Sequence, residues 1–490
     1  MTSQPARSSP ADQPAVRGPS LDIAVLGAGY VGLVTAACLA NLGHRVTAVE
    51  ADPIRLSALT RGEVPFSEPG LDELVRKELR SGRLAVSGDP ARSLAGREAV
   101  LVCVGTPLAD DGSADLSQLR SACAAIAEHA REATIVVRST LPPGVATSLR
   151  LWLRRADPRT IVLNPEFLRQ GTAVSDFLSP LRVVIGTSDG EPGPGSRLVE
   201  QLYRRTPAPV LITDYASAEL IKNAANAYLA TRLAFINEVA DLCEAYGADI
   251  DDVRRGLALD PRIGGSYLRP GVGFGGSCLP KELANLARLG REAGIELPML
   301  EGAQADNAVR PRLAIDRLER LVGPMNGRLV TVLGLAFKAG TDDVRDSPAL
   351  ALIRELTERG ALVRAHDPQV RAAVTARMRG VERCADPLDA CRGADIVILA
   401  TDWPAYRELD WEAVLEHVRR PVIFDTRAVL DGPALERAGW TLMRVGLAQR
   451  SRPRIQPRAN AGPRHRAGRG RPARDGWRIA AGIGRGGLEP

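Results

Sequence analysis

A cysteine inside a glycine-rich run is the residue of this sequence best suited to covalent chemistry. The run reads GVGFGGSCLPKE from Gly271 to Glu282, with four glycines in its first six residues. Such a backbone can lie close against a ligand. Pro280 favours the first turn of a helix, which places Cys278 near the helix N-terminus. The helix dipole and the nearby Lys281 are then expected to lower the pKa of the thiol, so the pattern predicts a nucleophile rather than an inert buried cysteine.

Two further polar residues share one face of a helix predicted from Ala216 to Tyr246. Lys222 and Asn226 are four positions apart in ELIKNAAN, so they point to the same side of the helix, and that side is otherwise apolar. An ammonium and an amide on an apolar face are costly unless they meet a ligand or a partner group. The chain has only four lysines among its 64 basic residues, which favours a specific need for this ammonium. A solvated face or an internal ion pair is the alternative.

A third pattern, GAGYVG at residues 27–32, lies between an apolar strand and a helix. The strand is expected at Leu21–Leu26, and a second strand, Arg45–Val49, ends at Glu50. Such glycines let a pyrophosphate approach the helix N-terminus, and the acid can hold the ribose hydroxyls. The carboxylate would repel a 2′-phosphate, so the predicted cofactor is NAD rather than NADP; a turn that only packs the helix is the alternative. The residues of this pattern expected to hold the cofactor are Gly27, Gly29, Tyr30, Val31, Gly32 and Glu50.

Polar loops follow two more of the predicted strands. The segment NPEFLRQG, Asn164–Gly171, follows the strand Thr160–Leu163, and Arg138–Thr140 ends the strand Thr134–Val137. Ligands of α/β sheets bind outside the carboxyl ends of the strands, so both loops are candidates for the site, although either alone is compatible with an ordinary loop. None of the five histidines lies in these motifs, which argues against a histidine-dependent dehydrogenase.

Strand and helix patterns alternate in two separate stretches of the chain, which predicts two parallel sheets built from βαβ units. Between them the long helix contains no Pro or Gly and is closed by Gly247. The predicted fold class is α/β, with two Rossmann-like parallel-sheet domains joined by a long central helix in a helical middle domain. The expected boundaries are 1–20 for a disordered segment, 21–212 and 323–447 for the sheet domains, 213–322 for the middle domain and 448–490 for a disordered tail. The further strands expected are Ala99–Val104, Leu329–Leu333, Leu362–Ala365, Asp395–Ala400 and Val422–Phe424.

The composition is that of a soluble globular protein, with 45% hydrophobic and 25% charged residues. No run reaches about 18 apolar residues, and no apolar core of a signal peptide occurs near the start, so neither a membrane partner nor secretion is expected. Seven cysteines argue against a disulfide scaffold and fit a reducing cytoplasm. Residues 450–490 hold eleven Arg against two acids. Such a tail could bind phosphates nonspecifically, but no nucleic-acid-binding fold accompanies it, so a solvated extension without a specific nucleic-acid partner is predicted.

Together these motifs resemble the UDP-glucose/GDP-mannose dehydrogenase family. GAGYVG, NPEFL, the Lys-x-x-x-Asn helix, FGGSCLPK and GLAFKAGTDDVR at Gly334–Arg345 follow one another in the family's order, over roughly residues 21–446. The resemblance implies a NAD-binding first domain, a central dimerisation domain, a nucleotide-sugar-binding third domain and a homo-oligomer that is at least a dimer. It also implies oxidation of the sugar C6 from alcohol to carboxylate with two NAD⁺ and one water. The intermediates would be a thiohemiacetal and a thioester on Cys278, and no metal would take part.

The resemblance also implies individual roles. Lys222 and Asn226 would stabilise the oxyanion, while Glu166 and Thr140 would position the water. Glu282 stands where the family usually has Asp, and Gln170 where it usually has Glu, so their roles are open. The cofactor set comprises Val31, Glu50, Arg55, Thr106, Thr140, Gln170, Lys281 and Arg345. The nucleotide-sugar set comprises Glu166, Phe167, Leu168, Arg169, Gln170, Lys222, Asn226, Tyr267, Leu268, Arg269, Pro270, Gly271, Gly275, Lys338, Arg427 and Arg262, the last reaching into a neighbouring subunit.

The identity of the nucleotide sugar is less constrained. TDWPAY at Thr401–Tyr406 and the Asp-x-Arg that ends at Arg427 resemble the UDP-glucose branch, whereas Tyr267–Gly271 and Phe337–Thr341 are reminiscent of the GDP-mannose branch. We predict UDP-glucose, with GDP-mannose or another nucleotide sugar as the alternative. A simple β-hydroxyacid dehydrogenase would have no use for Cys278. A non-catalytic NAD-binding regulatory protein is a further alternative, supported only by the two departures above.

Overall fold

The computed structural model describes residues 20–107, 109, 113–376 and 378–448. Disorder is expected for residues 1–20 and 448–490; apart from residues 20 and 448, these lie outside the described residues.

The first sheet has the strand order β3-β2-β1-β4-β5-β6-β7-β8. Neighbouring strands are parallel from β3 through β6, as expected, but β6 and β7 are antiparallel through Leu163 and Gly186. The last two strands, parallel to each other, thus run against the rest. The sheet continues two residues past the boundary expected at 212. Its strands are β1 (Asp22–Leu26), β2 (Arg45–Val49), β3 (Leu84–Ser87), β4 (Ala99–Val102), β5 (Thr134–Val137), β6 (Ile161–Leu163), β7 (Val183–Thr187) and β8 (Val210–Asp214).

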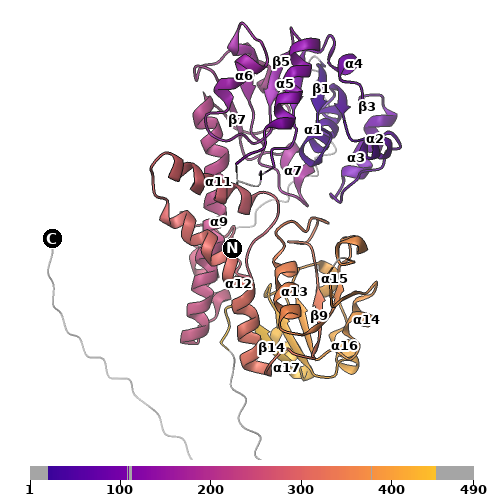
Figure 1. Cartoon of the computed structure of the whole chain (residues 1–490), viewed down its shortest axis with the longest axis vertical. Helices are drawn as coiled ribbons and strands as arrows, with labels where there is room; N and C mark the ends of the chain where they lie inside the picture. The colour runs from indigo at the N-terminus through magenta and orange to yellow at the C-terminus, as the bar shows by residue number, and fades with distance from the viewer. Residues whose placement is uncertain (1–19, 108, 110–112, 377, 449–490) are drawn as a thin grey trace, which may run out of the picture. The chain divides into compact units, whose positions relative to one another are not determined.

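Helices cover both faces of this sheet (Figure 1). Ile23 and Val25 of β1 belong to one buried cluster, while Ala24 and Leu26 belong to another, because successive strand residues point to opposite faces. The helices of this region are α1 (Tyr30–Asn41), α2 (Pro53–Thr60), α3 (Leu71–Arg80), α4 (Pro90–Leu94), α5 (Ser117–His129), α6 (Ala146–Trp152), α7 (Ala173–Leu178), α8 (Pro194–Leu202) and the short 3₁₀ turn Pro158–Thr160.

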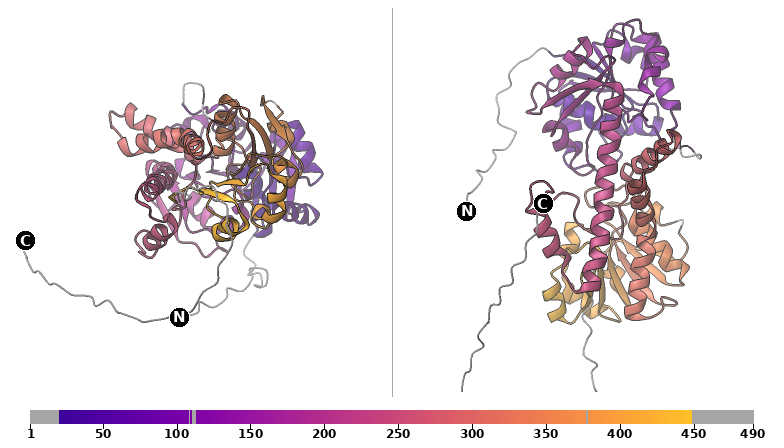
Figure 2. Two further views of the ribbon diagram at one scale, coloured as in Figure 1. Left: turned by 90° about the horizontal axis from the view of Figure 1, so that it is seen from below. Right: turned by 90° about the vertical axis from the view of Figure 1, so that its left-hand side faces the viewer.

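The middle region is helical and is dominated by α9 (Tyr215–Tyr246), which Figure 2 shows as one uninterrupted rod. Asp214 begins this helix by accepting a hydrogen bond from the Ser217 amide at 2.8 Å. Gly247 ends it at φ 74°, in the left-handed region that glycine adopts without strain. Thus both ends of the predicted helix are confirmed to within one residue. The other helices are α10 (Ile250–Ala258), α11 (Leu279–Glu292) and α12 (Pro298–Val322).

The second sheet repeats the topology of the first six strands, with the order β11-β10-β9-β12-β13-β14. All of its described strand pairs are parallel. Ligands bind such sheets at the carboxyl ends of the strands, near the point where the strand order reverses. The strands are β9 (Leu329–Leu333), β10 (Leu362–His366), β11 (Val381–Arg383), β12 (Ile396–Leu399), β13 (Val422–Asp425) and β14 (Thr441–Arg444); the helices are α13 (Pro348–Glu358), α14 (Pro387–Cys391), α15 (Pro404–Arg407), α16 (Trp411–His417), α17 (Gly432–Ala438) and the 3₁₀ turn Ala372–Val374.

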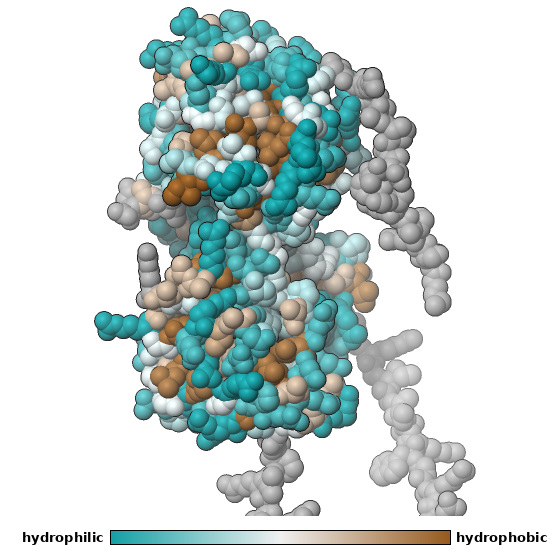
Figure 3. Space-filling view, turned by 90° about the vertical axis from the view of Figure 1, so that its right-hand side faces the viewer, coloured by the Kyte–Doolittle hydropathy of each residue, from teal (hydrophilic) through white to brown (hydrophobic). Residues whose placement is uncertain are grey.

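One helix takes part in the cores of all three regions. Ala218 of α9 packs in a core of the first sheet, and Ala230 packs with α11 and α12. Ile236 and Ala240 belong to the core of the second sheet. On the face shown in Figure 3, apolar residues form separate patches among polar ones, as on most protein surfaces.

Candidate active site

The GAGYVG glycines form the turn between β1 and α1. Gly29 directly precedes α1, and a Cβ there would meet no atom within 4 Å. A Cβ on Gly32, by contrast, would lie 1.7 Å from the carbonyl oxygen of Gly27. No side chain caps the first turn of α1, so its amides are available to an anion. The turn therefore has room for a pyrophosphate at the helix N-terminus.

Glu50 has the geometry of a ribose acceptor. Its carboxylate is buried, and Oε1 accepts hydrogen bonds from the Asp52 amide at 2.8 Å and from Arg55 Nη2 at 3.0 Å. Oε2 is buried and has no hydrogen-bond partner among the described residues. A buried acceptor without a hydrogen-bond donor is costly, and a ribose hydroxyl would supply the missing donor. The residues at this edge of the sheet thus fit NAD.

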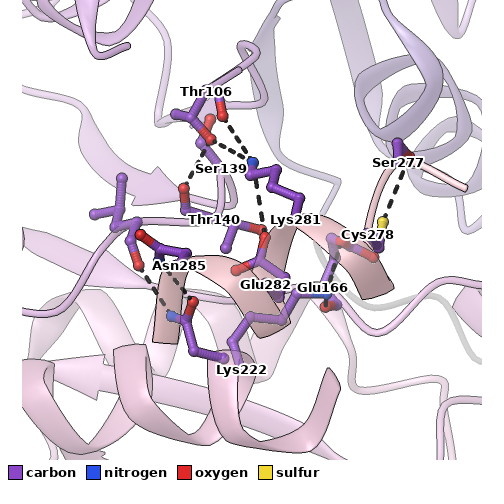
Figure 4. A network of polar contacts seen from close by, with 12 residues as sticks. Thr106, Ser139, Thr140, Glu166, Lys222, Ser277, Cys278, Lys281, Glu282 and Asn285 are labelled. Atoms are coloured by element: carbon purple, nitrogen blue, oxygen red, sulfur yellow. Dashed lines mark hydrogen bonds and ion pairs between the residues drawn. The ribbon is translucent and has the colours of Figure 1, made fainter. Parts of the chain in front are cut away.

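Lys222 and Glu166 form a buried ion pair (Figure 4). The Lys222 Nζ donates to Glu166 Oε1 at 2.9 Å and to the Glu166 carbonyl at 2.6 Å, and the Leu168 amide donates to Oε2 at 2.6 Å. Burial alone would raise the pKa of Glu166. Lys222, the Leu168 amide and Arg138 outweigh it and hold this pKa below its ordinary value. Lys222 thus forms the internal ion pair that was the alternative to a ligand contact. Its partner is the acid of the NPEFL loop, Glu166.

Asn226 lies one turn further along α9, and its buried Nδ2 has no hydrogen-bond partner among the described residues. An unpaired amide donor next to the ammonium suits a ligand oxygen.

Cys278 lies at the N-terminus of α11, as its motif predicts, and solvent reaches its side chain. The expected direction of its pKa shift is wrong. Close packing of protein groups and the carboxylate of Glu166 raise the pKa of the thiol, and the opposing effect of Lys222 is smaller. The ammonium of Lys281 is directed elsewhere: its Nζ donates to the Thr106 carbonyl at 2.7 Å, and it is not among the main groups that lower the pKa of the thiol.

Glu282 follows in the first turn of α11 and is buried. Its Oε1 lies 3.6 Å from Lys281 Nζ, and Oε2 has no partner among the described residues. Burial raises the pKa of Glu282, although Lys281 and Lys222 oppose the shift. A carboxyl with a raised pKa takes up a proton more readily than an exposed glutamate does, as a general base requires. Glu282, Thr106, Thr140 and Lys281 also line one small cavity.

Two buried asparagines connect these elements, and the sequence reasoning did not single them out. Asn223 Nδ2 donates to the carbonyls of Leu141 at 3.2 Å and Glu219 at 2.8 Å, and Asn285 Nδ2 donates to Asn223 Oδ1 at 3.4 Å. They join α9, α11 and the loop after β5. Asn285 lies three residues after Glu282 and therefore shares its face of α11. This spacing is the feature of the sequence that could have identified Asn285 as part of the site.

The segment Tyr267–Gly271 contacts the second sheet domain. The Gly271 amide donates to Asn237 Oδ1 at 2.8 Å, and a Cβ on Gly271 would lie 3.4 Å from Arg427 Nη1. Arg427 in turn donates to Asp402 at 3.4 Å. Tyr267 has a φ of 57°, a strained conformation for this residue. Within this segment Leu268 and Pro270 are buried, while Arg269 is exposed.

Several other predicted residues meet around the loop after β9. Gln170 Nε2 donates to Asp343 at 2.9 Å, and Arg345 pairs with the same carboxylate at 2.6 Å. A Cβ on Gly275 would lie 2.1 Å from the Asp346 carbonyl. Burial lowers the pKa of Lys338, with Arg169 acting in the same direction.

Other predicted residues are held differently. Phe167 lies under Arg182, with 3.9 Å between the guanidinium carbon and the ring centre, and Arg169 pairs with Asp176 at 2.7 Å. Val31 and Leu168 pack against a core of the first sheet. Arg262 is not brought to the site of its own chain: it pairs with Asp260, and 88% of its side chain is exposed.

The fold and site define a class, the NAD-binding dehydrogenases. The chain belongs to the UDP-glucose/GDP-mannose dehydrogenase family: its NAD binding domain matches at residues 21–207, its central domain at 216–309 and its UDP binding domain at 331–432. This family uses NAD, so the predicted family and cofactor are confirmed. Among the described residues, no helix is long and apolar enough to cross a membrane, and no group of His, Cys, Asp or Glu is arranged to hold a metal.

Individual relatives cover most of the chain. A UDP-glucose 6-dehydrogenase of Pseudomonas aeruginosa is 40% identical over 439 residues, which are 86% of this chain and 97% of that protein. UDP-glucose 6-dehydrogenase TuaD of Bacillus subtilis is 36% identical and covers 86% of this chain and 93% of its own length. The solved structure of a UDP-glucose dehydrogenase from Pyrobaculum islandicum is 37% identical, with a TM-score of 0.77 over 86% of this chain and 96% of that one.

Two glycines of the fingerprint should respond differently to the same substitution. Gly29→Ala places a methyl group in open space at a φ of −70°, so we expect a change in stability of about 0.5 kcal/mol or less. NAD binding should weaken about tenfold or more, because the methyl occupies the space of the pyrophosphate. Gly32→Ala should instead destabilise the fold. Thermal unfolding and NADH fluorescence titration measure the two effects; unaltered NADH affinity in Gly29→Ala would contradict the assignment.

The pH dependence of Cys278 alkylation should report the raised pKa of the thiol. The thiolate reacts, so its labelling by iodoacetamide should rise with pH through a midpoint above about 8.5, the value of a free cysteine. Glu166→Gln removes the negative charge that helps raise this pKa, so the midpoint should move to lower pH. Peptide mass spectrometry follows the site, with Cys278→Ser as the unlabelled control. A wild-type midpoint below that of free cysteine would refute the charge assignment.

Proposed function

We propose that this chain oxidises UDP-glucose to UDP-glucuronate with NAD⁺ as the electron acceptor. The observation that carries the proposal is a solvent-reached thiol, Cys278, among the charged groups Lys222, Glu166 and Glu282 in a NAD-binding protein. A simple alcohol dehydrogenase needs no nucleophile, whereas oxidation to a carboxylate needs a way to hold the aldehyde. The relatives named UDP-glucose 6-dehydrogenases support the choice of sugar.

In the proposed chemistry the C6 alcohol is first oxidised to an aldehyde, and Cys278 then forms a single covalent bond to C6. Its thiol adds to the C6 aldehyde to give a thiohemiacetal, and oxidation of this adduct gives a thioester. Water then attacks the thioester carbon, releasing the carboxylate and the thiol. When bound, NAD⁺ accepts a hydride in each of the two oxidations, so one UDP-glucose, two NAD⁺ and one water give UDP-glucuronate, two NADH and three protons.

The charged residues have distinct proposed tasks. Lys222 and the unpaired Nδ2 of Asn226 stabilise the negative oxygen that develops at C6. Glu166, kept ionised by Lys222, orients the water together with Thr140. Glu282 takes up a proton, which its raised pKa favours. Its side chain, one methylene longer than Asp, reaches the cavity that it shares with Thr140.

The ligand-binding residues follow the same division. For NAD we propose the fingerprint turn with Glu50, Arg55, Thr106, Thr140, Gln170, Lys281 and Arg345. For the nucleotide sugar we propose Glu166–Gln170, Lys222, Asn226, Tyr267–Gly271 and Gly275, with Lys338 and Arg427 as counter-charges of the diphosphate. We also propose that the protein works in the cytoplasm, since all seven cysteines are free and a reducing compartment keeps Cys278 reduced.

The stoichiometry of NADH release should test this function. With limiting UDP-glucose, the wild type should release two NADH per sugar, measured at 340 nm, with UDP-glucuronate as the product by mass spectrometry. Cys278→Ser should show little or no full turnover because the aldehyde has no nucleophile to hold it. GDP-mannose is assayed in parallel, and faster turnover of that sugar would reassign the substrate. One NADH per sugar, or normal turnover by the variant, would refute the covalent route.

We further propose that two copies of the chain pair through α9. Large apolar side chains remain exposed on one stripe of this helix. Their spacings of eight, seven, seven and four residues keep them within about a quarter of the helix circumference. Isolated exposed apolar residues are normal, but an aligned stripe on a long helix is typical of an interface. The stripe consists of Leu220 (45% exposed), Tyr228 (61%), Phe235 (51%), Leu242 (57%) and Tyr246 (86%). The exposed Arg262 would then be offered to the partner's site.

A charge in the centre of the stripe should separate the copies. Phe235→Asp buries a carboxylate in the proposed interface, so we expect the wild-type dimer or larger oligomer to become a monomer of 52.3 kDa by light scattering. Its activity should fall, since Arg262 loses the site that it completes. Leu151→Asp on α6 is the matched control, 79% exposed and outside the stripe. A monomeric and fully active wild type would contradict the proposal.

A further inference from the structure

A buried glutamate outside the residues considered so far connects two parts of the site. Glu68 lies in the loop between α2 and α3, with only 3% of its surface exposed. Its Oε2 accepts hydrogen bonds from the Tyr30 hydroxyl and from the Gly171 amide, the latter at 2.6 Å. Its Oε1 accepts from the Ala173 amide at 2.7 Å. One carboxylate thus receives three donors from two separate segments.

Each of these segments belongs to a different ligand site in the proposed function. Tyr30 is the first residue of α1, directly after the open Gly29 turn where the pyrophosphate fits. Gly171 ends the NPEFLRQG segment, which carries Glu166 and Gln170 and is proposed to hold the sugar. The ring of Phe66, in the same loop as Glu68, packs on Tyr30 with 5.0 Å between ring centres. The loop therefore fixes Tyr30 from two directions.

A carboxylate is the one side chain that satisfies all three donors. Glutamine has the same shape, but it presents one oxygen and one NH₂ group. If the amide oxygen faces Tyr30 and Gly171, the NH₂ group faces the Ala173 N–H. In the opposite orientation it faces the Gly171 N–H. A buried backbone N–H is left without an acceptor in either case, which is unfavourable.

We propose that Glu68 is a positioning residue that couples cofactor binding to nucleotide-sugar binding. The inference rests on the proposed function for the identity of the second ligand. NAD orders the α1 turn and Tyr30, Tyr30 fixes Glu68, and Glu68 holds the Gly171 and Ala173 amides at the end of the sugar-binding segment. Because such coupling is reciprocal, each ligand tightens the binding of the other by the same factor.

Binding of NADH in the presence and absence of UDP-glucose measures the coupling without turnover, since NADH cannot oxidise the sugar. In the wild type, saturating UDP-glucose should lower the Kd for NADH about fivefold or more. In Glu68→Gln this factor should fall to about one, and NADH alone should bind about tenfold more weakly. Titrations follow NADH fluorescence, and thermal unfolding reports stability separately.

Glu78 offers a matched control in the same domain. It is equally buried in α3 and pairs with Arg83 at 2.7 Å, but it contacts neither segment of the site. Glu78→Gln should lower the melting temperature while keeping the wild-type coupling factor. If Glu68→Gln also lowers only the melting temperature, its role is structural and the proposal is overturned.

A second variant tests the connecting bond itself. Tyr30→Phe removes the hydroxyl but leaves the Glu68 carboxylate with both backbone amides, so the protein should fold even if Glu68→Gln does not. The coupling factor should fall toward one, and an unchanged factor would overturn the proposal. The proposed function fails by a separate result, in which the wild type binds NADH but no UDP-glucose; that result also overturns the coupling, since no second ligand then exists.

Discussion

The ion pair between Lys222 and Glu166 is the interaction on which the site depends. Both groups are buried, and a buried charge is stable only beside an opposite charge with its hydrogen bonds satisfied. Loss of one partner from such a pair costs about 3–5 kcal/mol. The pair joins α9 to the loop after β6 and keeps both groups ionised, so it sets the charge that a bound substrate meets.

The same pair controls the thiol through opposing effects. Close packing, the largest effect, and the carboxylates of Glu166 and Glu282 disfavour the thiolate of Cys278, whereas Lys222 favours it. The groups of the free site therefore favour the protonated thiol over the thiolate. In the proposed mechanism, proton uptake by Glu282 is therefore part of the step in which the Cys278 sulfur bonds to C6.

The scaffold places these groups by combining repetition with one rigid helix. The first six strands of the first sheet and all six of the second have the strand order of a dinucleotide-binding domain. Each sheet can therefore bind a ligand at the carboxyl ends of its strands. The helix α9 shares a core with both sheets and with α11. Its burial along three cores holds Lys222 and Asn226 at a fixed height relative to the NPEFL loop and to Cys278.

The sequence by itself determined the features whose physical causes are local. Gly27, with a φ of 88°, and Gly32, where a Cβ would lie 1.7 Å from the Gly27 carbonyl oxygen, mark a turn that requires glycines. An uninterrupted run of helix formers ending at Gly247 defines α9, and apolar runs define the central strands. The three-residue edge strand β11, Val-Glu-Arg, carries no such apolar run, so it was not predicted. The edge strand β8 does begin with an apolar run, Val-Leu-Ile, but its residues stay partly or fully exposed, and it was not predicted either.

Only the tertiary structure decided how the charges are paired. Glu166 lies 56 residues before Lys222, and Glu68 more than 100 residues before the amides that it accepts, so no spacing in the sequence relates them. From the helix N-terminus and Lys281, the sequence predicted a lowered pKa for the Cys278 thiol. In the structure this pKa is raised. The physical reason is that a titration depends on every charge and on the packing within a few ångströms, and the fold brings those groups together from three separate segments, the loop after β6, α9 and the start of α11.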